Sequence, residues 1–161
     1  MIVIVMGVVG AGKTTVGKLL AEQMGWEFGD ADDFHHASNV EKIRNGVPLT
    51  DKDREPWLDL LRAKIVEWIE QRRSAVLACS ALKKIYRDKL DAGPEVRFVY
   101  LKGSRGLIAS RLKERRGHFA NESILASQLV DLEEPASAFA VEVSQTPQQI
   151  VSDIRKGLAL E

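Results

Sequence analysis

Short apolar runs along the chain alternate with longer stretches in which apolar residues recur every three or four positions. Compact runs rich in β-branched residues predict strands, whereas the longer spacing predicts helices. The predicted strands are Ile2–Met6, Trp26–Phe28, Ala75–Cys79, Val96–Leu101 and Phe139–Val143. The predicted helices are Lys13–Met24, Arg54–Gln71, Lys83–Asp91, Arg105–Arg115, Glu122–Glu133 and Pro147–Ala159. This alternation is typical of a parallel sheet with helices on both faces, so we expect an α/β fold.

The composition fits a single domain over residues 1–161, in which 45% of the residues are hydrophobic. Basic and acidic residues balance at 23 each, which argues against long nucleic acid as the main partner. The N-terminal apolar run is too short to cross a bilayer, so we expect no membrane association and no signal peptide. One cysteine, Cys79, excludes an intramolecular disulfide and favours a reducing compartment, with the cytoplasm as the default.

The segment Gly7-Val8-Val9-Gly10-Ala11-Gly12-Lys13-Thr14 matches the G-x-x-x-x-G-K-[ST] pattern of a phosphate-binding P-loop. It lies between a predicted strand and a predicted helix, which is the structural context that this motif requires. Backbone N–H groups of such a loop and the start of the next helix bind phosphate oxygens. We expect Lys13 to reach the β- and γ-phosphates of ATP and Thr14 to bind Mg²⁺. The predicted nucleotide-binding set is Gly7, Gly10, Ala11, Gly12, Lys13, Thr14 and Thr15.

A cluster of acidic residues follows the second predicted strand. Ligands of open α/β sheets bind at the carboxyl ends of the strands, so this cluster is expected to face the P-loop. We assign Asp32 as the base that orients an acceptor hydroxyl, and Asp30 to a water-mediated contact with Mg²⁺. His35 is a candidate for hydrogen bonding to a polyol. A solvated acidic turn and a surface histidine are the alternatives.

Basic residues gather in two later segments. Lys83 and Arg87 are four residues apart, so they share a helical face and suit an anionic substrate. Arg111 and Arg115 share a face in a basic segment that ends at a glycine, which indicates a helical lid at about 111–125. Closure of a lid would bring an arginine to the charge on a transferred phosphoryl group. Arg115 is the first candidate for this role and Arg111 is the second. A solvated basic face is the alternative reading of both pairs.

Two motifs of other nucleotide-binding proteins are missing from the sequence. No predicted strand ends in the aspartate that binds Mg²⁺ in many P-loop ATPases, since the third strand leads into Cys79-Ser80. There is also no Asn-Lys-x-Asp segment of the kind that reads guanine. These absences favour a small-molecule kinase over a motor ATPase or a GTPase.

Several further segments together resemble the gluconokinase family, which is related to shikimate and nucleoside monophosphate kinases. The resemblance covers nearly the whole chain and is more specific than the P-loop alone. It rests on Asp30-Ala31-Asp32, Gly46–Asp51, Asp53-Arg54-Glu55-Pro56-Trp57-Leu58, Ser80-Ala81-Leu82-Lys83, Tyr100–Gly103, Gly117-His118-Phe119 and Leu132-Glu133-Glu134-Pro135.

The resemblance implies a three-layer P-loop kinase fold with a five-stranded parallel sheet and a small lid. It implies transfer of phosphate from Mg-ATP to D-gluconate, giving 6-phosphogluconate, often by a homodimer. Residues implied at the sugar acid are Asp32, His35, Arg54, Lys83, Arg87 and His118, with Arg115 in the lid. A kinase for another small anion such as shikimate, and a nucleotide-sensing module without transfer chemistry, are the alternative functions.

Overall fold

The structure, a computed structural model of the chain, describes residues 1–114 and 119–160. Its centre is a five-stranded sheet in the order β2-β3-β1-β4-β5, in which every neighbouring pair is parallel. The strands are β1 (Ile2–Met6), β2 (Glu27–Asp30), β3 (Ala75–Ala78), β4 (Val96–Lys102) and β5 (Phe139–Glu142). The α/β fold with a five-stranded parallel sheet is thus confirmed.

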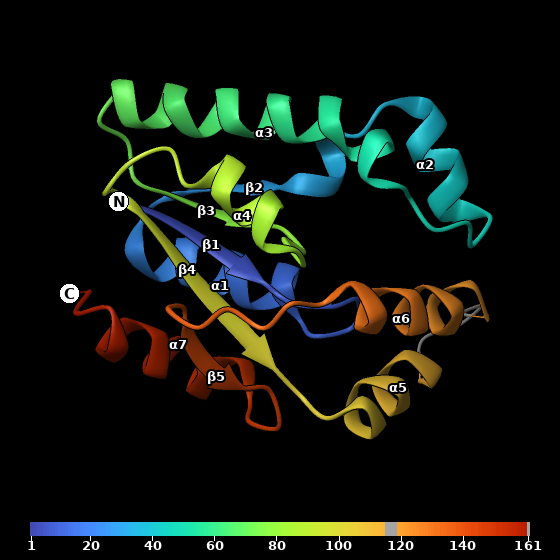
Figure 1. Cartoon of the computed structure of the whole chain (residues 1–161). Helices are drawn as coiled ribbons and strands as arrows, with labels where there is room; N and C mark the ends of the chain where they lie inside the picture. The colour runs from blue at the N-terminus through green and yellow to red at the C-terminus, as the bar shows by residue number, and fades with distance from the viewer. Residues whose placement is uncertain (115–118, 161) are drawn as a thin grey trace.

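Helices cover both faces of this sheet and form a three-layer arrangement (Figure 1). The helix α3 lies along one face with α4 beside it, while α1 and α7 lie against each other on the opposite face. The helices are α1 (Lys13–Met24), α2 (Ala37–Arg44), α3 (Asp51–Glu70), α4 (Lys84–Leu90), α5 (Arg105–Lys113), α6 (Phe119–Asp131) and α7 (Pro147–Gly157). Over the described ranges, none of them combines the length and hydropathy needed to span a bilayer.

The strand β1 shows why both faces are apolar. Its alternate side chains point to opposite faces of the sheet. Ile4 packs in one core with Trp57 and Leu61 of α3. Val5 packs in the other core with Leu20 of α1 and with residues of α7. Because both faces of β1 are buried, its sequence is a continuous apolar run rather than an alternating one.

A third apolar cluster joins the P-loop to the helices that follow β4. Val8 of the loop packs with Ile108 and Leu112 of α5 and with Leu125 of α6. Gly10 permits this approach, since a Cβ at this position would lie 3.0 Å from the Leu112 side chain. Its φ of 83° is also in the left-handed region that favours glycine. The P-loop is therefore fixed from the side of α5 and α6 as well as from β1.

The sequence analysis missed α2 and placed the start of α3 too late. A capping box sets the true start: Asp53 N–H donates to Thr50 Oγ1 over 3.1 Å, and Thr50 N–H donates to Asp53 Oδ2 over 2.9 Å. Lys42 of α2 also binds Asp53 at 3.0 Å. These bonds lower the pKa of Asp53 to about 2, because they favour its ionised form. Thr50–Asp53 thus begins α3 and attaches α2 to it.

Two neighbouring leucines of α3 give a matched test of the core. Leu61 is fully buried, whereas Leu60 is 45% exposed. We expect Leu61→Ala to lower the free energy of unfolding by about 2–5 kcal/mol, because it leaves a cavity in the core. Leu60→Ala should change it by less than about 1 kcal/mol. Urea unfolding measures both values, and equal losses would contradict this packing of α3.

Candidate active site

The P-loop connects β1 to α1 in the geometry expected of a phosphate-binding loop. Gly12 is the N-cap of α1 with a φ of 96°, a conformation that glycine adopts without strain. Lys13 Nζ donates to the Val8 carbonyl oxygen over 3.0 Å, so this ammonium lies along the loop. Ala11 is buried, and its N–H donates to the same carbonyl over 3.1 Å. Gly7 lies at the end of β1, where its N–H contacts the Ser80 carbonyl at 3.4 Å.

The two aspartates that follow β2 lie beside this loop. Thr14 Oγ1 donates to Asp30 Oδ2 over 3.0 Å, and the other oxygen of Asp30 accepts the Asp32 N–H over 3.0 Å. Desolvation and the nearby Asp30 charge raise the pKa of Asp32, while the Lys13 ammonium lowers it. Asp32 and Lys13 therefore act on each other electrostatically. A carboxylate with a raised pKa beside an ammonium is well suited to accept a proton.

A cavity of about 250 Å³ joins the P-loop to these aspartates and continues toward α3. Its walls come from the P-loop and start of α1, the ends of β2 and β3, the segment before α3, the first turns of α3, and α6. Among the residues predicted for the site, the cavity wall includes Gly10, Gly12, Lys13, Thr14, Thr15, Asp30, Asp32, His35 and Arg54. A phosphate-binding loop, a candidate base and a buried cation thus share one cavity.

Besides Lys13 of the P-loop, the cavity contains the cation Arg54, called the cavity cation below, which is only 9% exposed. Its Nη1 donates to the Tyr86 hydroxyl over 2.9 Å and lies 3.7 Å from Asp131 Oδ2. A guanidinium has five N–H donors, so these contacts leave others for a substrate carboxylate. The position in α3, directly after the capping box, fixes its backbone.

His35 and Trp57 also line the cavity and form a stacked aromatic pair. Their rings are stacked with centroids 4.3 Å apart, and Trp57 Nε1 donates to the Ala31 carbonyl over 2.7 Å. Burial, followed by the positive charge of Arg54, lowers the pKa of His35 to about 4. His35 is therefore neutral near pH 7, where its ring can both donate and accept a hydrogen bond.

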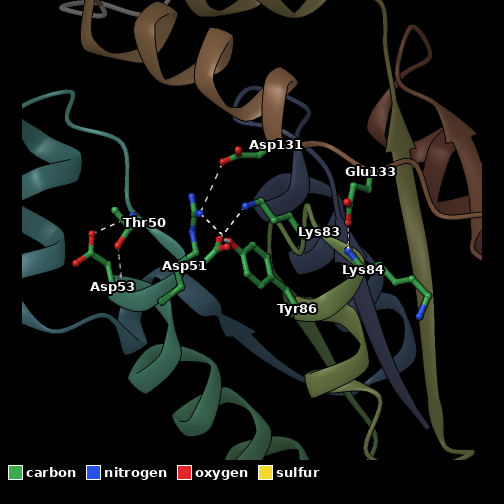
Figure 2. Close-up of polar contacts among 9 residues, drawn as sticks. Thr50, Asp51, Asp53, Lys83, Lys84, Tyr86, Asp131 and Glu133 are labelled. Atoms are coloured by element: carbon green, nitrogen blue, oxygen red, sulfur yellow. Dashed lines mark hydrogen bonds and ion pairs between the residues drawn. The ribbon is translucent and has the colours of Figure 1, made fainter.

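Lys83 does not line the cavity but belongs to a neighbouring polar network, which Figure 2 shows. Its Nζ donates to Asp51 Oδ1 over 2.8 Å, and the same oxygen accepts a very short hydrogen bond from the Tyr86 hydroxyl. These bonds lower the pKa of Asp51 and raise that of Lys83. Because the Tyr86 hydroxyl also accepts a hydrogen bond from Arg54, this network helps to hold the Arg54 guanidinium in place.

The structure does not bring Arg87 to the cavity. Its guanidinium is buried and donates to the carbonyl oxygens of Ala81, Leu82 and Glu133 over 2.8, 3.0 and 2.8 Å. These bonds join the loop after β3 to the segment after α6. The helical spacing of Lys83 and Arg87 predicted that both cations would face an anionic substrate. It could not show that backbone carbonyl groups accept the hydrogen bonds of the Arg87 guanidinium.

The basic residues expected in the lid are only partly described. Arg111 donates a short hydrogen bond to the Val143 carbonyl oxygen at the end of β5, outside the lining of the cavity. Arg115 and His118 lie outside the described residues. The lid expected at about 111–125 is described only through α5 and α6, which pack on the P-loop.

Two groups of cavity residues were not foreseen from the sequence. Ile43, Val47, Pro48 and Leu49 contribute an apolar wall from α2 and the segment after it. Ile124, Ser127 and Gln128 contribute a wall from α6. One signal was available in α6, where Gln128 interrupts a helical row of leucines at positions 125, 129 and 132.

Thr14 and Asp30 suit a Mg²⁺ ion that arrives with a nucleotide. The Thr14 hydroxyl donates a hydrogen bond to Asp30, which leaves lone pairs of the hydroxyl oxygen available to a metal. Mg²⁺ in such sites keeps several waters and takes few protein ligands besides substrate phosphates. Residues 1–114 and 119–160 contain no group of three or more His, Cys, Asp or Glu side chains arranged to hold a metal. The Thr14 hydroxyl and the Asp30 carboxylate are both oxygen donors, which is the ligand type that Mg²⁺ takes.

Comparison with known proteins gives matches over nearly the whole chain. A profile of the shikimate kinase family matches residues 9–159. A gluconokinase from Gluconobacter oxydans (strain 621H) is 47% identical, over 82% of this chain and 75% of its own length. The crystal structure of a gluconokinase from Sinorhizobium meliloti 1021 is 43% identical with a TM-score of 0.86, covering 98% of this chain and 90% of that one. An unliganded sugar kinase from Janibacter sp. HTCC2649 is 40% identical with a TM-score of 0.91, covering 99% and 94%.

The lowered pKa of His35 gives a pH-dependent stability. The unfolded chain binds a proton at His35 near pH 6.5, whereas the folded chain binds it only near pH 4, so acid favours unfolding between these values. His35→Phe keeps a ring against Trp57 but removes the titration. Between pH 7 and pH 4 the unmodified protein should lose about 1–3 kcal/mol more unfolding free energy than this variant. Urea unfolding across this range measures the difference, and parallel pH curves would contradict the burial of His35.

Proposed function

The chain belongs to the gluconokinase family, and from this membership we propose that it transfers the γ-phosphoryl group of ATP to the terminal hydroxyl of D-gluconate. The products are 6-phosphogluconate and ADP. The single observation that carries the proposal beyond family membership is the shared cavity of Lys13, Asp32 and Arg54. It provides a phosphate site, a proton acceptor and a cation for a carboxylate in one place.

The transfer follows from the positions of these groups. Lys13 and the backbone N–H groups of the P-loop hold the β- and γ-phosphates at the start of α1. Asp32 accepts the proton of the acceptor hydroxyl while the oxygen of that hydroxyl forms a bond to the γ-phosphorus. The bond between that phosphorus and the bridging oxygen breaks, and the electron pair leaves with ADP. The raised pKa of Asp32 favours this role, because the carboxylate must take the proton during the transfer.

Arg54 holds the carboxylate at the other end of the sugar acid in this proposal. A guanidinium binds a carboxylate through paired N–H donors, and the buried position of Arg54 strengthens that attraction. His35 is neutral near pH 7 and offers a hydrogen bond to a hydroxyl of the sugar chain. The cavity therefore offers a guanidinium for the carboxylate, a neutral imidazole for a hydroxyl, and a carboxylate beside the Lys13 ammonium of the P-loop.

Mg²⁺ would be held by Thr14 and, through water, by Asp30, and it would offset phosphate charge during the transfer. The proposal also includes roles for Arg111 and Arg115 at the nucleotide, a homodimeric state and a cytoplasmic location. The homodimeric state and the lid role of Arg115 rest on the resemblance of the sequence to the family. The role of Arg111 rests on its basic segment, and the cytoplasmic location rests on the single cysteine.

An acceptor panel tests the proposed function. Release of ADP by the purified protein should depend on gluconate and not on shikimate or a nucleoside monophosphate. The panel includes shikimate because the matching family profile carries that name. Turnover with shikimate alone would overturn the acceptor assignment. ATP binding without any acceptor-stimulated turnover would instead support a nucleotide-sensing module.

Asp32→Asn tests the proposed proton acceptor, with its neighbour Asp33, which does not line the cavity, as the matched control. We expect Asp32→Asn to lower kcat by about 100-fold or more while ATP binding persists, because an amide cannot accept the hydroxyl proton. Asp33→Asn should keep kcat within about threefold of the unmodified protein, since surface substitutions have small effects. Steady-state kinetics and calorimetric ATP titration give both quantities. Near-normal turnover of Asp32→Asn would remove this residue from its role.

Arg54→Met tests the carboxylate site. It removes the guanidinium but keeps a side chain of similar length, so KM for gluconate should rise by about 10- to 100-fold, the scale of a hydrogen bond to a charged group. Arg97→Met, at an exposed position of β4, is the control and should leave KM unchanged. Thermal melting of each variant monitors folding. An unchanged KM in a folded Arg54→Met protein would place the carboxylate elsewhere.

A further inference from the structure

Gln128 of α6 makes a direct hydrogen bond to the P-loop. The backbone N–H of Val9 donates to Gln128 Oε1 over 2.7 Å, across a separation of 119 residues in sequence. Val9 lies between the apolar anchor Val8 and the tight turn at Gly10. A P-loop N–H is the kind of group that binds phosphate oxygens, so a side chain bound to one lies next to the phosphate site.

The packing of α6 fixes where Gln128 lies. Leu125, one turn earlier, is 3% exposed and belongs to the apolar cluster that contains Val8 and Leu112. Residues three apart on a helix share a face, so Gln128 lies on the same inner face of α6. Asp131, a further three residues along, lies 3.7 Å from Arg54. One helix face therefore contacts both the P-loop and the cavity cation.

The chemistry of the amide sets the direction of the side chain. A backbone N–H only donates, so the group that faces Val9 must be the amide oxygen. The NH₂ group of Gln128 is then a donor, and it makes no hydrogen bond to the backbone or side chains that the structure describes in residues 1–114 and 124–160. Gln128 lines the cavity that holds Lys13 and Asp32. A neutral donor at this wall suits an anionic oxygen.

We propose that Gln128 is a binding residue for the transferred phosphoryl group. Its oxygen fixes the Val9 N–H, and its NH₂ group donates to an oxygen of the γ-phosphoryl group. The cavity extends from the P-loop toward Asp32 and Arg54. In this proposal the ligand groups beside Gln128 are therefore the terminal phosphate and the acceptor, and not the adenine ring of the nucleotide. The inference rests on the proposed phosphoryl transfer and deepens it.

Two substitutions separate the accepting and donating roles. Gln128→Met has a similar length but makes neither hydrogen bond. Gln128→Glu can still accept from Val9 but, when ionised, cannot donate and adds a negative charge beside the phosphate. Gln71→Met is the control, because Gln71 is an exposed residue at the end of α3 whose side chain contacts only Glu67, at 3.4 Å. Thermal melting compares the folding of all three variants.

The expected result is a loss that depends on the γ-phosphoryl group. In Gln128→Met, kcat should fall by about tenfold, the scale of one lost hydrogen bond, and in Gln128→Glu it should fall further. The affinity for ADP, measured by calorimetry, should stay within about twofold, whereas the affinity for AMP-PNP should fall by about tenfold. Gln71→Met should match the unmodified protein in all of these measurements.

Three results would overturn the inference. The first is turnover of Gln128→Met within about twofold of normal. The second is full turnover of Gln128→Glu, since this would show that the accepting bond alone suffices. The third is an equal loss of ADP and AMP-PNP affinity, which would make Gln128 only a support of the loop. The ratio of AMP-PNP to ADP affinity needs no acceptor, so it tests Gln128 even if gluconate itself is not turned over.

Discussion

The hydrogen bond between Thr14 and Asp30 joins the P-loop side of the candidate site to the acidic segment after β2. Thr14 begins α1 after β1, while Asp30 ends β2, and β3 lies between these strands in the sheet. Parallel register brings the carboxyl ends of all three strands to the same edge, so a single side-chain contact can bridge over β3. The separation between the P-loop and the acidic segment after β2 therefore depends on the geometry of the sheet.

The elements with a strong local signal could be predicted from the sequence. The apolar run of β1, the glycine loop and the periodic helices each follow from spacing that a few neighbouring residues define. The helix α2 was missed because its buried contribution is small and polar, with Asn39 as its buried residue. Its position depends on Asn39 Nδ2 donating to the Asp53 carbonyl over 2.8 Å and on the ion pair of Lys42. Such long-range contacts leave no periodic pattern in the sequence.

The site was predictable where chemistry follows directly from position in a motif. Lys13, Thr14 and Asp32 lie at strand ends, and the cavity includes them all. For Arg87 the sequence showed a charge but not its partners, and the carbonyl groups that surround it became known only from the fold. Arg54 and Arg87 are both buried, but their partners differ. Arg54 contacts the Tyr86 hydroxyl and, at 3.7 Å, the Asp131 carboxylate, whereas Arg87 donates to backbone carbonyl oxygens. The partners of a buried cation, and not its presence, decide its function.

Cys79 is a shielded thiol at the wall of the cavity. It is the single cysteine of the chain, it is 1% exposed at the end of β3, and burial raises its pKa to about 12. Thiol reagents attack the thiolate, so the closed protein offers them almost none of the reactive form. The rate at which a thiol reagent alkylates the Cys79 sulfur would therefore report how often its surroundings expose it to solvent. Because Cys79 lines the candidate cavity, the same shielding also limits its oxidation there.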